Sequence, residues 1–195
     1  CWNRVVQRGI KYSLVIGAAG NKGLGLFAGE YIPAGAFLAQ YAGEVLGPDA
    51  AKERDRHRPP EYNGATYVYT LDFEREKVPV GAELCVDAMF RGNVSRFINH
   101  SCDPNGILAI VKYDSGDLRL YRLAFFARRE IAKGEEITID YCPKLRADQA
   151  DGTDGVDDDE DDEEDTEDVA DNASESTTNN LACQCGAPIC RGKLW

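Results

Sequence analysis

The sequence predicts a β-rich α+β domain built from small curved sheets. Short apolar runs of high β-propensity recur through the first 145 residues and are separated by Gly and Pro. Strands do not alternate with helices and no internal repeat is visible, so a doubly wound nucleotide-binding fold is not expected. A length of 195 residues suits one domain with an appendage.

Each element follows from its local pattern. One helix is expected over 48–57, because Pro48 suits a first helical turn and mixed charges follow it. A shorter helical turn is expected over 94–99. The expected strands are 12–16, 25–28, 37–41, 66–71, 84–86, 107–113, 118–126 and 136–141.

Composition divides the chain into a globular region to about residue 145, a linker over 146–181 and a cysteine-rich tail over 182–195. From Asp151 to Leu181 there are 15 acidic residues and no Lys or Arg. Outside this tract 19 acids face 22 bases, so the net charge of −12 belongs to the tract. Like charges repel, and we expect the tract to be disordered. A solvated insertion is the favoured interpretation, and a guide for basic substrates is the alternative.

Cysteine usage points to metal binding. No apolar run approaches the ~18 residues that a membrane span requires, and no secretory signal opens the chain. We expect a fragment of a longer protein, since the chain starts at Cys1. Seven cysteines, an odd number without a signal, favour reduced thiols over a disulfide framework. Three of them fall within eight residues, Cys183, Cys185 and Cys190. Zinc prefers four ligands, so a fourth must come from elsewhere.

Polar residues are densest from Asn99 to Asn105, framed by apolar runs. Taken alone, His100 is more simply explained as a hydrogen-bonded core histidine, and His57 as an exposed bystander. The pair Gly23 and Gly25 fits a hairpin turn best. It lacks a dinucleotide fingerprint, although glycine would also allow backbone to approach a small molecule closely.

Together these motifs resemble a known family. Asn99-His100-Ser101-Cys102-Asp103-Pro104-Asn105, then Ile139-Asp140-Tyr141, then Cys-x-Cys-x4-Cys, resemble the SET domain with its post-SET zinc motif. The resemblance runs from Gly23 to the C-terminus, interrupted by the acidic tract. The opening residues 1–9 resemble the end of the pre-SET zinc cluster in the Su(var)-type subfamily, which methylates lysine nine of histone H3.

The resemblance implies a domain organisation. Residues 1–9 would end a pre-SET region, 10–145 would form a SET domain with a C-terminal pseudoknot, 146–181 would be an acidic disordered insert, and 182–195 a short zinc-bound post-SET tail. Cys1 would be a candidate ligand of a further pre-SET zinc in the full-length protein.

It also implies site residues. Tyr141 would be the catalytic tyrosine, with Tyr41 and Tyr67 lining a lysine channel. Structural zinc would be held by Cys102, Cys183, Cys185 and Cys190. S-adenosylmethionine would be held by Lys22, Gly23, Leu24, Tyr67, Arg96, Asn99, His100, Tyr141 and Trp195.

The implied function is S-adenosylmethionine-dependent methylation of histone lysine, most simply di- to trimethylation of lysine nine of histone H3, in heterochromatin formation and gene silencing. The implied partners are the histone H3 tail and the nucleosome, with no membrane, in the nucleus and on the chromosome. Two alternatives stay open. One is a methyltransferase for another histone or non-histone lysine. The other is a catalytically weak SET-fold chromatin scaffold.

The sequence departs from the family's pattern in three ways. Leu24 stands where a Trp is usual, which weakens that cofactor contact. Ile139 stands where Phe or Tyr is usual, and its missing hydroxyl leaves room for higher methylation states. Of the pre-SET cysteines only Cys1 is present, so these residues cannot build that cluster.

Overall fold

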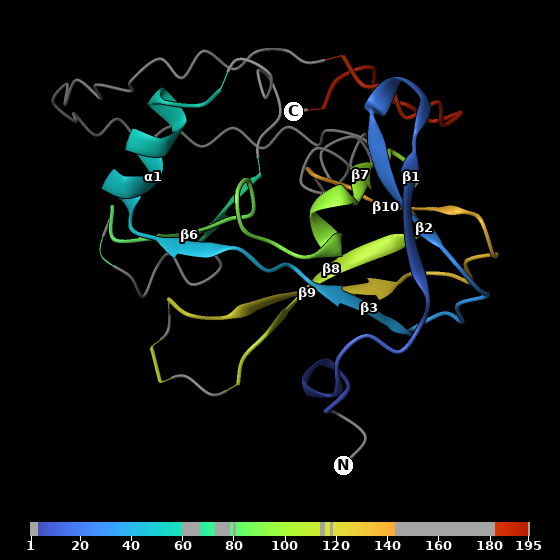
Figure 1. Cartoon of the computed structure of the whole chain (residues 1–195), viewed down its shortest axis with the longest axis horizontal. Coiled ribbons are helices and arrows are strands. Elements are labelled where there is room, and N and C mark those ends of the chain that lie inside the picture. The colour runs from blue at the N-terminus through green and yellow to red at the C-terminus, as the bar shows by residue number, and fades with distance from the viewer. Residues whose placement is uncertain are drawn as a thin grey trace, which may run out of the picture.

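The protein is described by a computed structural model covering residues 4–59, 67–72, 79, 81–113, 116–117, 119–142 and 182–194 (Figure 1). The described part contains three small sheets, one α-helix and short 3-10 turns. The strands are β1 (Leu14–Ala18), β2 (Leu24–Ala28), β3 (Phe37–Gln40), β4 (Glu44–Leu46), β5 (Val68–Leu71), β6 (Leu84–Asp87), β7 (Asn99–His100), β8 (Gly106–Val111), β9 (Arg122–Ala127) and β10 (Glu136–Ile139); the helix is α1 (Pro48–Arg56), and the 3-10 turns are η1 (Val6–Arg8), η2 (Gly20–Lys22) and η5 (Val94–Phe97).

The four-stranded sheet has the order β1-β2-β10-β7, which brings the two ends of the domain together. β1 and β2 form an antiparallel hairpin, and β10 pairs antiparallel with β2. β7 then pairs parallel with β10, with Thr138 opposite Asn99 and Ile139 opposite His100. The polar Asn99–Asn105 segment therefore lies directly against the strand that leads to Tyr141.

Asn105 fixes the crossing of these two segments. Its side chain is 2% exposed and makes three hydrogen bonds. It donates to the Glu135 carboxylate and to the Glu136 carbonyl, both at 2.8 Å, and accepts from the Thr138 N–H at 2.9 Å. At Gly106 the chain passes so close to β10 that a Cβ would lie 2.9 Å from the Thr138 carbonyl. These contacts bring the two segments together as the expected pseudoknot requires.

The main core lies between the four-stranded sheet and the sheet of order β3-β9-β8. Leu26, Ile32, Leu38, Ile131 and Ile137 are fully buried there. A smaller apolar cluster joins the third sheet, of order β4-β6-β5, to β9. Burial of these side chains stabilises the domain body, at about 25 cal/mol per Å² of apolar surface removed from water.

The predicted fold class is confirmed, and so are the predicted strands and helix, with ends that differ by a few residues. Two strands were missed, β4 and β7, because three and two residues carry too little pattern. Asn99 was expected to end a helical turn. That was wrong, since the turn stops at Phe97 and Asn99 enters β7 by pairing with distant β10.

The surface is uneven in character. No side chain of α1 is buried, and the helix is attached to the third sheet by Arg54, which bridges Glu44 and the fully buried Asp87.

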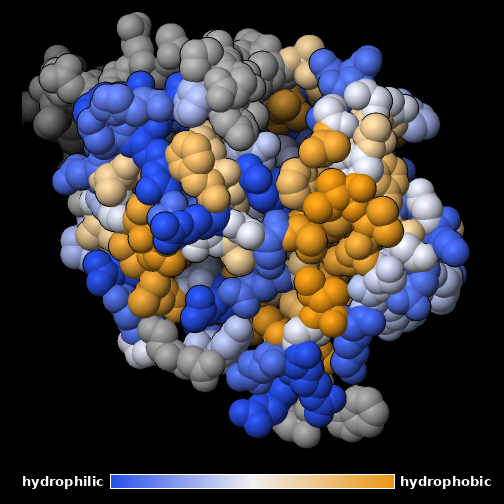
Figure 2. Space-filling model, in the orientation of Figure 1, coloured by the Kyte–Doolittle hydropathy of each residue, from blue (hydrophilic) through white to orange (hydrophobic). Residues whose placement is uncertain are grey.

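Figure 2 shows the largest apolar area of this face in its right half. Exposed apolar side chains of the sheets include Val15, Ile16, Leu24 and Ile107. None of the described helices combines the length and apolarity needed to cross a membrane. The acidic tract lies outside the described residues.

Candidate active site and cysteine cluster

Four cysteines meet where the tail returns to the domain body. Cys102 follows β7, whereas Cys183, Cys185 and Cys190 belong to the tail. Their four sulfur atoms all lie within 4.8 Å of one another, and those of Cys102 and Cys183 are 3.8 Å apart. Zinc–sulfur bonds of about 2.3 Å in a tetrahedron put sulfurs about 3.8 Å apart. The four residues therefore fit a zinc ion.

The backbone around the cluster favours thiolates. The N–H of Arg191 donates to Cys102 Sγ at 3.3 Å, that of Ala187 to Cys185 Sγ at 3.5 Å, and that of Gly192 to Cys190 Sγ at 3.4 Å. A backbone N–H aimed at sulfur stabilises negative charge on it. The cluster is thus built to hold several thiolates, as a cation of charge +2 requires.

The thiol pKa values are unequal. Burial raises the pKa of Cys102 and raises that of Cys183 to about 12. Burial alone would raise the pKa of Cys185 as well, but backbone and thiol hydrogen bonds from its neighbours lower it to about 6. Without metal, the thiol of Cys185 thus ionises more readily than those of Cys102 and Cys183. Bound zinc would take the place of the thiol protons.

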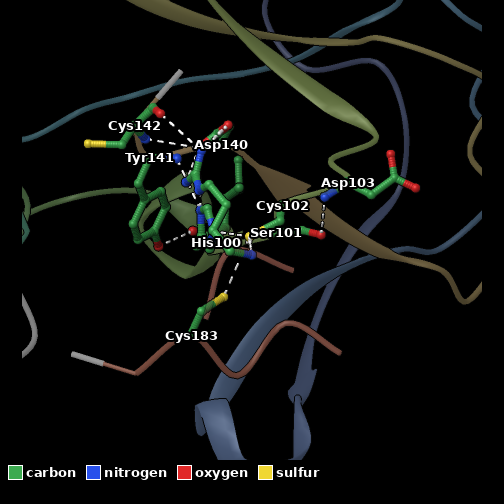
Figure 3. Close-up of polar contacts among 10 residues, drawn as sticks. His100, Ser101, Cys102, Asp103, Asp140, Tyr141, Cys142 and Cys183 are labelled. Atoms are coloured by element: carbon green, nitrogen blue, oxygen red, sulfur yellow. Dashed lines mark hydrogen bonds and ion pairs between the residues drawn. The ribbon is translucent and has the colours of Figure 1, made fainter. Parts of the chain in front are cut away.

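His100 links the cysteine cluster to Tyr141. Its ring is buried, with Nε2 3.3 Å from Cys102 Sγ. Nδ1 accepts from the Tyr141 backbone N–H at 3.2 Å, so the ring proton belongs on Nε2 and points at sulfur. Burial lowers the pKa of His100 and outweighs the nearby Asp140 carboxylate, which would raise it. Figure 3 shows the ring between Tyr141 and Cys102, with Cys183 turned toward Cys102.

The Tyr141 hydroxyl donates to the Ile98 carbonyl at 2.8 Å, and its ring lies 5.4 Å from the His100 ring, centroid to centroid. Burial raises its pKa above the ordinary value, so the phenol stays protonated at neutral pH. The residue is still 38% exposed, which leaves part of it open to a ligand. Tyr141 is therefore held at both ends, by its backbone and by its hydroxyl.

Tyr41, Tyr67 and Arg96 form a second group beside it. The Tyr41 hydroxyl donates to the Tyr67 carbonyl at 2.6 Å, and burial raises the pKa of Tyr41 above its ordinary value. The Arg96 guanidinium lies 4.5 Å from the centre of the Tyr67 ring and donates to the Met89 carbonyl at 2.7 Å. These contacts join Tyr41 and Arg96 to Tyr67.

Lys22 of the glycine segment and Asn99 meet at the Glu136 carboxylate of β10. Lys22 Nζ pairs with the Glu136 carboxylate at 2.6 Å, and the Asn99 amide donates to the same carboxylate at 2.8 Å and to the Leu24 carbonyl at 3.1 Å. Gly25 is required here, because a Cβ would lie 2.8 Å from Ala19 Cβ. The interpretation of this segment as a hairpin turn is thus supported, because Gly23 has a φ of +79° where the chain turns into β2.

Some predicted residues lie elsewhere. Trp195 and Cys1 lie outside the described residues. His57 is exposed at the end of α1, as predicted. Ile139 is 8% exposed and packs in the main core.

One residue was missed by the sequence analysis. Arg191 makes a bidentate ion pair with Asp140, at 2.8 and 3.0 Å, and both side chains are nearly buried. The only hint in the sequence was its place directly after Cys190. A single Arg in a cysteine-rich tail otherwise looks like any surface residue.

The comparisons with known proteins agree with this geometry. The family model of the SET domain matches residues 23–142. Histone-lysine N-methyltransferase SUV39H2 of Xenopus tropicalis is 38% identical over 195 residues, covering 100% of this chain and 42% of that protein. Its human counterpart is 36% identical over the same share of both chains. The chain thus spans less than half the length of these relatives.

Solved structures give the same result. The Neurospora SET domain protein DIM-5, described as a histone lysine methyltransferase, has a TM-score of 0.66 and 34% identity over 72% of this chain and 56% of that one. Arabidopsis thaliana SUVH6 in complex with SAM has a TM-score of 0.67 and 27% identity over 100% of this chain and 35% of that one. Matched over more than half of its length, the chain belongs to the SET-domain family and is similar to its Su(var)-type members.

Proposed function

We propose that this chain is the catalytic domain of an S-adenosylmethionine-dependent histone-lysine N-methyltransferase acting on lysine nine of histone H3. The observation that carries the proposal is the chain of contacts from Cys102 through His100 to Tyr141. It ties the tail and the cysteine cluster to the protonated phenol of Tyr141, which is partly open to a ligand. The names of the SUV39H2 relatives and of DIM-5 support the histone-lysine substrate.

A lysine substrate must lose its proton before it can react. A lysine ammonium has no lone pair, and its ordinary pKa is about 10.4. Aromatic walls from Tyr41, Tyr67 and Tyr141 would desolvate the ammonium and favour the neutral amine. S-adenosylmethionine, when bound, supplies a methyl group on a positively charged sulfur.

The tyrosine hydroxyls are suited to positioning an amine and not to removing its proton. Both the Tyr41 and the Tyr141 hydroxyl donate to backbone carbonyls, which directs their oxygen lone pairs away from those bonds. Burial raises the pKa of each phenol, so neither is a tyrosinate base at neutral pH. Their oxygens can accept N–H or weak C–H hydrogen bonds. Fixing an in-line geometry can account for ~7–11 kcal/mol of a barrier.

We assign the remaining predicted residues to the cofactor. Lys22, Gly23 and Leu24 would hold its methionine end, and Asn99 and His100 its adenine end, with Tyr67, Arg96 and Trp195 alongside. The exposed Leu24 side chain would give a weaker contact than Trp, while its backbone keeps its place. Zinc would be held by the four cysteines of the cluster, with a structural role. Nuclear, chromatin-bound action in gene silencing follows from the proposed substrate.

The test is methyl transfer from labelled S-adenosylmethionine to histone H3 tail peptides, with zinc present. We expect label on the peptide that contains lysine nine, none when that lysine is replaced by alanine, and about 100-fold slower transfer in Tyr141→Phe. Label that persists without lysine nine would move the proposal to another lysine. Protein that binds zinc but neither binds S-adenosylmethionine nor labels any peptide would favour a SET-fold scaffold.

A further inference from the structure

Arg191 lies between the cysteine cluster and the segment that carries Tyr141. Its side chain is only 4% exposed, although none of the described tail residues, 182–194, is classed as buried as a whole. The guanidinium holds both Asp140 oxygens and also donates to the Cys142 carbonyl at 3.1 Å. Its own backbone N–H donates to Cys102 Sγ at 3.3 Å. One residue thus contacts both the cysteine cluster and the two neighbours of Tyr141.

The segment Asp140–Cys142 lies beyond the sheet and is held by hydrogen bonds, among them those of Tyr141 to His100 and Ile98. β10 ends at Ile139, so no sheet ladder continues past that residue. Asp140 accepts from the Cys142 N–H at 3.0 Å, which closes a tight turn around Tyr141. Arg191 donates hydrogen bonds to both ends of this turn, at the Asp140 carboxylate and the Cys142 carbonyl. Besides the contacts of Tyr141 with His100 and Ile98, its two neighbours in the chain are thus held by a residue of the tail.

Among the described side chains, the His100 ring also lies near Asp140, with Nδ1 3.7 Å from the carboxylate. This nitrogen accepts the Tyr141 N–H, so it has no proton to donate to Asp140. Loss of Arg191 would leave a nearly buried carboxylate unpaired, which is costly. Lysine could restore the charge but not the planar fork that meets both oxygens.

We infer that Arg191 is a positioning residue for the proposed methyl transfer. When the cysteine cluster closes, Arg191 is held against the turn of Asp140–Cys142 and fixes the position of Tyr141 within it. The inference rests on the proposed function for its kinetic part. Its structural part stands apart, because the clamp can be detected without turnover.

The test compares Arg191→Met and Arg191→Lys with Arg119→Met. Arg119 makes the same kind of bidentate pair, with Asp117, on the exposed surface, so its loss serves as the matched control. Three quantities are measured: bound zinc per chain, amide hydrogen exchange at Tyr141 and Cys142, and kcat with KM for the peptide. We expect Arg191→Met to keep its zinc, to exchange faster at both amides, and to lose about 10- to 100-fold in kcat with little change in KM. Arg191→Lys should fall between, and Arg119→Met should match the wild type.

A double-mutant cycle with Tyr141→Phe separates positioning from general loosening. If Arg191 acts through the Tyr141 hydroxyl, Arg191→Met should cost little further kcat in the Tyr141→Phe background. Additive losses, unchanged exchange at Tyr141 and Cys142, or loss of zinc together with activity would each overturn the inference. A wild type that methylates no peptide, while Arg191→Met still speeds exchange with zinc bound, would refute the proposed function and leave the clamp standing.

Discussion

The domain body and the tail are held by different forces. The body has a continuous apolar core and a crossing in which the polar side chain of Asn105 is fully satisfied. The tail, over 182–194, has no buried residue, and one isolated bridge joins Ala182 to Lys193. It is fastened through sulfur and through Arg191. We therefore expect burial to stabilise the body and a metal ion to stabilise the tail, so that stability of the body and assembly of the site can be changed separately.

The largest effect should follow loss of the cluster. We expect Cys190→Ala or zinc chelation to release the tail and to abolish methyl transfer, because structural zinc contributes on the order of 10 kcal/mol. The body should keep its circular dichroism and most of its unfolding temperature. Limited proteolysis of the tail, with zinc content and activity, checks this. Cys142→Ser, which changes a thiol outside the cluster, is the control. If chelation of zinc made the body unfold cooperatively, the body and the tail would not be stabilised separately.

A substitution in the domain body should instead lower the stability of the body itself. Asn105→Ala should lower the free energy of unfolding by about 2–4 kcal/mol, since it removes a buried amide and leaves its partners on Glu135, Glu136 and buried Thr138 without their hydrogen bonds. Urea unfolding measures the loss, with exposed Asn21→Ala as the control. A loss below about 1 kcal/mol would mean that water or a neighbour replaces the amide.

A change at the boundary between the regions should alter products more than stability. Ile139→Tyr adds a hydroxyl close to the turn that carries Tyr141, and Ile139→Phe adds the same ring without it. Overpacking should cost each variant about 1–3 kcal/mol. We expect mass spectrometry of the peptide to show mainly monomethyl product with Tyr, and higher states with Phe. Equal product ratios in the two variants would refute a role for the hydroxyl.

The smallest expected effect concerns pH. Burial would raise the pKa of Glu135, but hydrogen bonds from Asn105, Ala132 and Arg129 outweigh it and lower the pKa below the ordinary value. Its stabilising contribution is therefore full above the unfolded-state pKa and is lost as pH falls through the folded-state value. Relative to Glu135→Gln, the wild type should lose about 0.5 kcal/mol on acidification, because the side chain is partly exposed. Parallel unfolding curves at pH 7 and pH 3 measure it, and a constant difference would contradict it.

Local chemistry was enough to predict much of this molecule. The spacing of Cys183, Cys185 and Cys190 predicted a metal cluster with a missing ligand, since thiolates at such intervals have few other uses. Apolar runs between Gly and Pro predicted the strands, because burial of one face sets their period. The resemblance carried by Asn99–Asn105 and Tyr141 then implied the family to which the chain belongs.

Tertiary structure alone decided what joins these parts. Strand β7 exists because β10 pairs with it, 39 residues away at Thr138 and Asn99, and no local preference encodes that pairing. Arg191 is a buried clamp because the cluster brings it to Asp140, 51 residues distant along the chain. Sequence by itself thus determined which groups were available, through residue chemistry and short-range periodicity. Which of them meet was decided by the fold, since hydrogen bonds and ion pairs across such separations depend on the packing of the whole domain.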